Sequence, residues 1–335
     1  MAVAVIGAGS WGTALAWLLG QKGYSVWLWG RDAQQINRIA RERVNRRYLP
    51  EARLPDSVRP TAETAPLQAC AVWVLAVPSG ALRATLALRP PPDAALVIAA
   101  KGLEPNTGKL LTQVVCETLP DSESRTVALS GPNLAVELVR GAPTATVAAS
   151  RNLACAEQIQ ELLMTPPTLR VYTNDDVVGV ELGGALKNVY AIGAGISDGM
   201  GFGDNTKATL LTRGLAEMMR FGAAMGARPE TFMGLTGVGD LFATAVSKLS
   251  RNYRLGRAVA EGKTAERALA ELGQVAEGYP TALVAQSLAA QLGVEMPLLN
   301  AIASILRGER ALHDALQSLM TRPPKGEREF EVRAL

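Results

Sequence analysis

The chain has 335 residues, of which 48% are hydrophobic and 19% are charged, a composition typical of a folded globular protein rather than a disordered or fibrous one. This length is sufficient for two domains, each with its own core. The formal net charge of +3 is small for this length, which argues against a dedicated nucleic-acid-binding surface but allows a local anion site.

The first half of the chain alternates short β-branched runs with helical patterns, as a parallel sheet with crossover helices requires. The expected strands are Val3–Ile6, Ser25–Trp29, Ala71–Val77, Ala95–Ala99, Thr126–Leu129 and Thr144–Ala148. The expected helices between them are Trp11–Gln21, Ala33–Arg43, Gly80–Leu88 and Thr107–Thr118. The polar, proline-containing segment 45–66 predicts an irregular connection.

From about Asp175 onward the pattern changes to helices. Pro280 and Pro297 stand where first-turn prolines occur, and Gly293 and Gly308 stand where helices end. We therefore expect an α/β fold, with an N-terminal Rossmann-type, mostly parallel sheet in a dinucleotide-binding domain over residues 1–175. An all-helical substrate-binding and catalytic domain should occupy residues 176–335, and its charged tail after residue 322 predicts a loose terminus.

The cysteines and the start of the chain favour a cytoplasmic protein. Cys70, Cys116 and Cys155 are odd in number and lie among apolar residues, which is typical of reduced, buried thiols without a metal. The first apolar run starts at Ala2, which leaves no room for a signal peptide, and no apolar segment reaches the ~20 residues of a membrane span.

The stretch "VAVIGAGSWG" predicts a dinucleotide site. Its three glycines follow a strand and open a helix: Gly7 permits the tight turn, Gly9 lets a pyrophosphate approach the backbone, and Gly12 lets helix and strand pack closely. At the end of the second strand, Arg31 is suited to a 2′-phosphate, so NADPH should bind at least as well as NADH. Asp32 is suited to a ribose hydroxyl, but we favour a role as the cap of the following helix.

The stretch "ELGGALKNVYAIGAG" carries one lysine in an apolar helical pattern. At a spacing of four, Gly183, Lys187, Ala191 and Gly195 form a narrow stripe of small residues, which is compatible with a groove around Lys187. A lysine that packs its stem and reaches water is the alternative. Carbonyl reduction needs a proton donor, and the single histidine, His313, lies in a polar stretch, so Lys187 becomes the candidate acid.

Two further stretches carry residues that could bind a substrate. Asp240 and Thr244 are spaced to share one helix face, and Ser250, Arg251 and Asn252 stand at the start of the next helix, where a phosphate is well bound. Without other support, we favour a plain helix cap and a solvated arginine there.

Lys101 follows the strand that ends at Ala99, and the carboxyl ends of parallel strands are where open α/β sheets bind ligands. A solvated loop lysine is the alternative.

Taken together, the chain resembles the bacterial-type NAD(P)-dependent glycerol-3-phosphate dehydrogenases. The matching segments occur in the family's order: "GAGSWGTALA", "VPS", "KGLE", "SGPNLAVEL", "ELGGALKNVYAIGAGISDG", "GDNTKATLLTRGLAEM", "GLTGVGDL", "SRNYRLG" and "VAEG". The resemblance implies interconversion of dihydroxyacetone phosphate and sn-glycerol 3-phosphate with NAD(P)H, a supply of glycerol 3-phosphate for phospholipid synthesis, and a homodimer.

The resemblance also implies roles for individual residues. It places the general acid/base at Lys187, a second substrate lysine at Lys101 and an accompanying acid at Asp240. The remaining substrate contacts fall on Gly131, Asn133, Ser250, Arg251 and Asn252. Besides the glycine loop, the cofactor contacts fall on Ser10, Trp11, Arg31, Lys101, Ala135, Arg251, Val275 and Glu277.

Departures from the family pattern are few. Ala245 replaces a frequent cysteine, and Asn133 replaces a frequent Ser or Thr, so only fine specificity is affected. Two other functions are compatible with these residues: another lysine-dependent two-domain hydroxyacid dehydrogenase, and a non-catalytic dinucleotide sensor. The paired "GVGDL" and "SRN" segments argue against the first, and the intact lysine set argues against the second.

Overall fold

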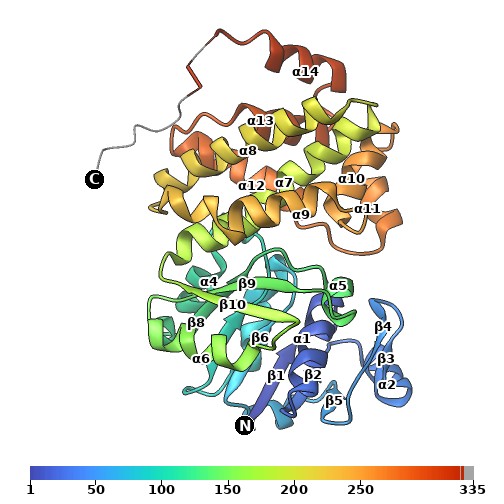
Figure 1. The fold of residues 1–335 in the computed structure, drawn as a ribbon, viewed down its shortest axis with the longest axis vertical. Helices are drawn as coiled ribbons and strands as arrows, with labels where there is room; N and C mark the ends of the chain where they lie inside the picture. The colour runs from blue at the N-terminus through green and yellow to red at the C-terminus, as the bar shows by residue number, and fades with distance from the viewer. Residues whose placement is uncertain (325, 328–335) are drawn as a thin grey trace.

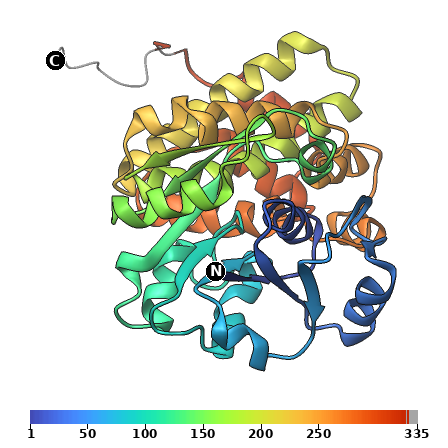
Figure 2. The ribbon, with the colours of Figure 1, turned by 60° about the horizontal axis from the view of Figure 1, so that its bottom comes forward.

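The computed structural model describes residues 1–324 and 326–327. Strands β1 to β10, which end at residue 174, form the sheet region with their helices, and helices α7 to α14, from residue 177 to 320, form the helical region. Figure 1 shows the helical region above the sheet region, and Figure 2 brings the sheet region forward. Most of the charged tail, residues 325 and 328–335, lies outside the described residues.

The expected mostly parallel sheet is confirmed, with eight strands in the order β10-β9-β8-β7-β6-β1-β2-β5. Every neighbouring pair is parallel except β8 and β9. The eight strands are β1 (Ala2–Ile6), β2 (Ser25–Trp29), β5 (Val58–Thr61), β6 (Val72–Leu75), β7 (Ala95–Ile98), β8 (Thr126–Ser130), β9 (Thr144–Ala149) and β10 (Leu169–Asn174).

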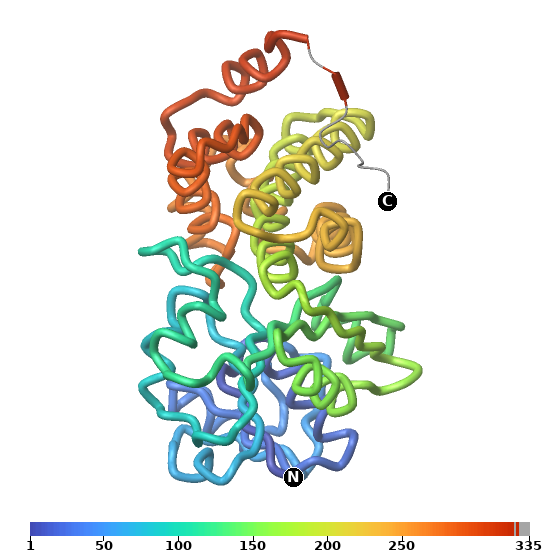
Figure 3. The backbone as a smooth tube through the Cα atoms, turned by 90° about the vertical axis from the view of Figure 1, so that its left-hand side faces the viewer, coloured from blue at the N-terminus to red at the C-terminus, as the bar shows by residue number. Residues whose placement is uncertain are grey.

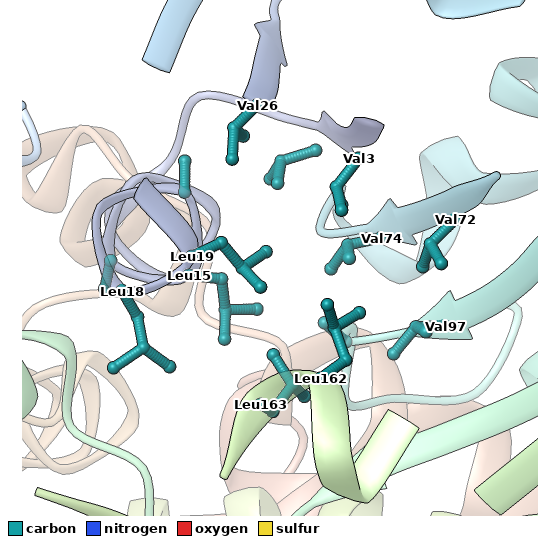
Figure 4. Packing of buried hydrophobic residues seen from close by; sticks show 14 of the residues in the cluster. Val3, Leu15, Leu18, Leu19, Val26, Val72, Val74, Val97, Leu162 and Leu163 are labelled. Carbon is teal, nitrogen blue, oxygen red and sulfur yellow. The ribbon is translucent and has the colours of Figure 1, made fainter. Parts of the chain in front are cut away.

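Both faces of the sheet are buried, because the strands are apolar at nearly every position. In β1, Val3 and Val5 contribute to one hydrophobic cluster, while Ala4 and Ile6 contribute to another on the opposite face. Figure 4 shows Leu15 of α1, among other leucines, facing the valines of the first cluster. The central strands β1, β6, β7 and β8 are therefore covered on both faces, whereas the edge strands are not fully covered.

Most expected helices of the sheet region are present. The α-helices are α1 (Ser10–Gln21), α2 (Ala33–Glu42), α3 (Leu82–Thr85), α4 (Leu111–Thr118), α5 (Ala135–Val139) and α6 (Leu153–Leu163). The expected helix Gly80–Leu88 is wrong as one continuous helix, since 3₁₀ turns Ser79–Ala81 and Leu86–Leu88 flank α3. The expected helix Thr107–Thr118 begins later, at Leu111, because Gly108 adopts a left-handed φ of 73°.

The interpretation of segment 45–66 as irregular is also wrong. It contains the hairpin strands β3 (Val44–Asn45) and β4 (Leu49–Arg53), and then β5. Pro60 is accommodated because β5 is an edge strand. The other edge strand, β10, is missing from the expected strands; it alternates buried and exposed residues over its first four positions.

The helical region is helical as expected, and the prolines and glycines singled out in its sequence lie at helix starts and ends as predicted. Its helices are α7 (Val177–Gly199), α8 (Asp204–Ala224), α9 (Asp240–Val246), α10 (Arg251–Ala260), α11 (Ala265–Leu272), α12 (Gly278–Gln291), α13 (Pro297–Leu306) and α14 (Leu312–Met320). Pro280 and Pro297 lie in first turns, and Gly293 and Gly308 follow helix ends with φ of 67° and 70°. No helix in the described part of the chain has the length and apolarity needed to cross a membrane.

Helix α7 joins the two regions and is buried on all sides through most of its length (Figure 3). Val177 and Val180 pack against residues of β8 and β9. The Glu181 carboxylate accepts hydrogen bonds from the backbone N–H, at 3.1 Å, and the hydroxyl of Thr112, which opens α4. These contacts hold the N-terminal part of α7 against β8, β9 and the start of α4.

The three thiols are free, as expected. Cys70 and Cys155 are buried, whereas Cys116 is only partly buried. Burial raises the pKa of Cys70 to about 11.

Lys22 should contribute to stability through the carboxyl end of α6. Its ammonium donates to the backbone oxygens of Glu161, Leu162 and Met164 at 2.9, 2.8 and 2.7 Å, and a cation is favourable at a helix C-terminus. Lys22→Met should lower the free energy of unfolding by about 1–3 kcal/mol, measured by urea denaturation. Lys248→Met, at an exposed lysine, is the control; equal stability of the two variants would contradict this role.

Candidate active site

The glycine loop connects β1 to α1 beside the end of β6, where the strand order reverses direction. Gly7 has a φ of 117°, and a Cβ there would lie 2.5 Å from the Ala76 oxygen. A Cβ at Gly12 would lie 2.0 Å from the Gly7 oxygen, whereas a Cβ at Gly9 would meet nothing within 4 Å. The first and third glycines therefore serve the turn and the packing, and the second leaves the backbone open to a ligand.

Free donors surround this opening. Gly9 provides no side-chain cap for α1, so the first N–H groups of the helix remain available. The indole Nε1 of Trp11 is buried and donates to no described group. The Ser10 hydroxyl is not one of these free donors, because it donates to the Tyr48 oxygen at 2.8 Å. The open backbone and these donors fit the pyrophosphate of a dinucleotide.

Arg31 and Asp32 follow β2, and their surroundings in the structure differ. Asp32 accepts a hydrogen bond from the Gln35 N–H at 3.0 Å and is the N-cap of α2, as favoured from the sequence. Arg31 is exposed at the same turn. Arg31 is therefore the residue that is free to meet a 2′-phosphate.

A cluster of two lysines and one aspartate lies between the two regions. The Lys187 ammonium donates to Asp240 Oδ1 at 2.8 Å and to Thr244 Oγ1 at 2.6 Å. The Lys101 ammonium donates to Asp240 Oδ2 at 2.7 Å and to the Gly131 oxygen at 2.6 Å. One carboxylate from α9 thus bridges a lysine of α7 and a lysine beyond β7.

The surroundings of this cluster shift the pKa of Lys187. Lys187 is only 6% exposed, and burial lowers its pKa to about 8. Asp240 opposes this shift, while Lys101 and Arg251 add to it. Burial raises the pKa of Asp240, but the two ammonium groups outweigh it and hold this pKa below its ordinary value. Lys187 is therefore able to give and take a proton near neutral pH.

The glycines of α7 do not line an open groove. A Cβ at Gly183 would lie 2.7 Å from the Thr236 oxygen, and a Cβ at Gly195 would lie 2.1 Å from the Tyr253 oxygen. The close approach that these glycines permit is thus made by the chain itself, at the 235–239 turn before α9 and at α10. The groove interpretation is wrong, and Lys187 lies instead in the buried cluster with Asp240 and Thr244.

Ser250 and Asn252 have partners at the start of α10. The Ser250 hydroxyl caps the helix by accepting from the Tyr253 N–H at 3.2 Å, as favoured from the residues alone. Asn252 donates to Asn188 Oδ1 at 2.8 Å and accepts from the Gly278 N–H at 2.9 Å. The Ser250 O–H and one amide N–H of Asn252 remain as donors for a ligand.

Arg251 lies between the lysine cluster and the glycine loop. Burial lowers the pKa of its guanidinium, while Glu277 and Tyr48 raise it. Its charge also lowers the pKa of Lys187. Arg251 is thus electrostatically coupled to Lys187 and Glu277, and its contact with both substrate and cofactor stays a prediction.

Three further predicted residues are Asn133, Ala135 and Val275. Asn133 supports the turn after β8, because it donates to the Ala145 oxygen at 3.1 Å and accepts from the Thr146 hydroxyl at 3.0 Å. Ala135 begins α5, and Val275 is 45% exposed before α12.

Sequence reasoning missed Asn188 as a site residue, although it follows Lys187 and is a buried amide in an apolar helix. An amide beside the lysine in an otherwise apolar helix was the available signal. Ser79, at the end of the "VPS" segment, donates its hydroxyl to Glu277. His313 lies on α14, at the far end of the molecule from the sheet (Figure 1).

A pocket lies elsewhere on the molecule. It has a volume of about 540 Å³, lies between β9, β10 and the chain before α9, and includes Val147, Tyr172 and Leu235 in its lining. None of the predicted site residues lines it. We base the active site on the cluster of charges, because chemistry requires converging functional groups rather than volume. The described residues contain no group of three or more His, Cys, Asp or Glu side chains that could hold a metal ion.

Comparisons with known proteins identify the family. Residues 2–156 match the family model "NAD-dependent glycerol-3-phosphate dehydrogenase N-terminus", and residues 176–317 match the corresponding C-terminus model. The glycerol-3-phosphate dehydrogenase [NAD(P)+] of Geobacillus kaustophilus is 46% identical over 331 residues, covering 97% of this chain and 96% of the relative. That of Thioalkalivibrio sulfidiphilus is 48% identical over 329 residues, covering 97% and 98%.

A solved structure agrees. The crystal structure of glycerol-3-phosphate dehydrogenase from Coxiella burnetii has a TM-score of 0.91 and 37% identity, and covers 96% of this chain and 99% of that chain. Identity at this level over nearly the whole length, together with both family models, shows that the chain belongs to the family of NAD(P)-dependent glycerol-3-phosphate dehydrogenases.

Proposed function

We propose that the cluster of Lys187, Asp240 and Lys101 is the catalytic centre at which this NAD(P)-dependent enzyme interconverts dihydroxyacetone phosphate and sn-glycerol 3-phosphate. The observation that carries the proposal is the Asp240 carboxylate, which bridges the buried Lys187 at 2.8 Å and the partly buried Lys101 at 2.7 Å. The division of the chain into a dinucleotide-binding domain over residues 1–175 and a catalytic domain over residues 176–335 belongs to the same proposal. Family membership sets aside the alternative dehydrogenase and the sensor.

The cofactor, when bound, supplies or accepts a hydride at its nicotinamide ring. The glycine loop fits a pyrophosphate, and the exposed Arg31 favours a 2′-phosphate. The residues that we assign to the cofactor are Gly7, Gly9, Ser10, Trp11, Gly12, Arg31, Lys101, Ala135, Arg251, Val275 and Glu277.

The substrate phosphate would be held at the start of α10. Arg251 offers a planar fork of donors, and Ser250 and Asn252 retain one donor each. Gly131, Asn133 and Lys101 complete the substrate contacts that we assign, on the sheet side of the cleft. Fixing the phosphate holds the C2 carbonyl in one place relative to Lys187.

Lys187 is the proton donor in reduction and the proton acceptor in oxidation. A pKa of about 8 lets the same group carry out both roles. Thr244 and Asp240 accept hydrogen bonds from its ammonium and so orient it. Lys101 adds positive charge where the alkoxide of C2 forms.

This activity supplies glycerol 3-phosphate for phospholipid synthesis. A cytoplasmic location, a homodimeric assembly and the absence of a nucleic-acid partner are parts of the proposal that rest on composition or resemblance.

The phosphate requirement tests the proposed function directly. Oxidation of NADPH should be rapid with dihydroxyacetone phosphate and slower by at least ~10²-fold with dihydroxyacetone, because the clamp supplies the positioning energy. Lys187→Ala should lower turnover by about 10²- to 10⁴-fold and still bind NADPH, which a fluorescence titration measures.

Thr209→Ala, at an exposed threonine of α8, is the control and should keep full turnover. Equal rates with and without the phosphate, or near-normal turnover of Lys187→Ala, would contradict the assignment.

The cofactor preference depends on Arg31. Arg31→Ala should raise the KM for NADPH by roughly tenfold, because a charged donor to the 2′-phosphate is lost, and should change the KM for NADH little. Steady-state kinetics with both cofactors measure this. An equal change for both cofactors would show that Arg31 does not contact the 2′-phosphate.

A further inference from the structure

One contact joins the sheet region to the helical region. Glu277 precedes α12 in the helical region, and Ser79 follows β6 in the sheet region. Glu277 Oε1 accepts the Ser79 backbone N–H at 2.9 Å, and Glu277 Oε2 accepts the Ser79 hydroxyl at 2.6 Å. Both oxygens of one carboxylate are thus occupied by one residue that lies 198 positions away.

This pair packs against the backbone that carries Lys101. A Cβ at Gly102 would lie 2.9 Å from Ser79 Oγ and 3.1 Å from Glu277 Oε2. The residue next to Lys101 therefore contacts both members of the pair and has no room for a side chain. A movement of Ser79 or Glu277 would be transmitted directly to the lysine.

The same pair is close to the glycine loop and to the phosphate clamp. Ala76, three residues before Ser79, lies against Gly7. On the other side, Glu277 is the acidic group that most strongly raises the pKa of Arg251, and the pKa of Glu277 itself is raised by burial. The pair thus lies among three parts of the site that come from distant parts of the sequence.

We propose that Ser79 and Glu277 are positioning residues, which fix the Lys101 backbone relative to Arg251 and thereby assemble the substrate site before the ligands bind. The inference rests on the proposed function, because it concerns the placement of residues assigned there. It extends the role of Glu277 beyond cofactor contact and gives Ser79 a role. Neither side chain needs to touch the reacting atoms.

A positioning role for Glu277 and direct binding of a ligand by its carboxylate lead to different expectations. Direct binding depends on the carboxylate and not on Ser79. Positioning depends on the two hydrogen bonds, so loss of the Ser79 hydroxyl should act through Glu277. A double-mutant cycle separates the two, because coupled residues give non-additive effects.

The experiment uses Ser79→Ala, Glu277→Ala, Glu277→Gln and the double alanine variant. The kcat for dihydroxyacetone phosphate should fall about tenfold in Ser79→Ala, equivalent to ~1.4 kcal/mol, while the KM for this substrate does not rise. The double variant should be no worse than Glu277→Ala. Glu277→Gln, which keeps an acceptor for the Ser79 N–H, should lose less than Glu277→Ala.

A second readout needs no cofactor. Hydrogen–deuterium exchange of the protein without ligands should be faster in residues 77–82 and 100–104 of Ser79→Ala and Glu277→Ala than in the wild type. This readout separates the inference from the proposed function, because it does not depend on turnover. Ser287→Ala, which removes an exposed serine hydroxyl from α12, is the matched control and should leave both readouts unchanged.

Wild-type behaviour of Ser79→Ala in both kcat and exchange would overturn the proposal. So would a Glu277→Gln variant that loses as much activity as Glu277→Ala, because the charge alone would then explain the role of Glu277. If Glu277→Ala fails to fold, Ser79→Ala and Glu277→Gln still decide between the two roles.

Discussion

The Asp240 carboxylate, held between the ammonium groups of Lys187 and Lys101, is the interaction on which the site depends. Two ammonium groups this close repel each other, and the carboxylate between them offsets this repulsion. Lys101 comes from the sheet region, whereas Lys187 and Asp240 come from the helical region. The ion cluster therefore exists only when the two regions are docked, which makes the packing of the fold a condition of the chemistry.

The packing of the two regions against each other depends on glycines as well as on the ion cluster. Gly183 lets the chain before α9 approach α7, so that Asp240 and Thr244 reach Lys187, and Gly102 lets the Lys101 backbone approach Ser79 and Glu277. Substituting either glycine would place a Cβ within 3 Å of a neighbouring atom. The positions of the charged groups thus depend on the close backbone packing that these glycines allow.

The sequence was sufficient to predict six of the eight strands of the sheet and the helical second half, because these depend on local patterns. The glycine loop and the capping role of Asp32 follow from spacing and side-chain chemistry alone. The partner of each α7 glycine could not be predicted, because Thr236 and Tyr253 are distant in sequence. For the same reason the Ser79–Glu277 contact and the buried amide pair of Asn188 and Asn252 were found only in the structure.

The pH dependence of kcat/KM for dihydroxyacetone phosphate, compared between the wild type and Asp240→Asn, tests the central claim most directly. Reduction needs protonated Lys187, so the wild-type rate should fall as the pH rises through about 8. Asp240 raises the pKa of Lys187, so its neutralisation should move this fall to lower pH. An unchanged profile, or a shift to higher pH, would contradict the coupling of Asp240 to the catalytic lysine.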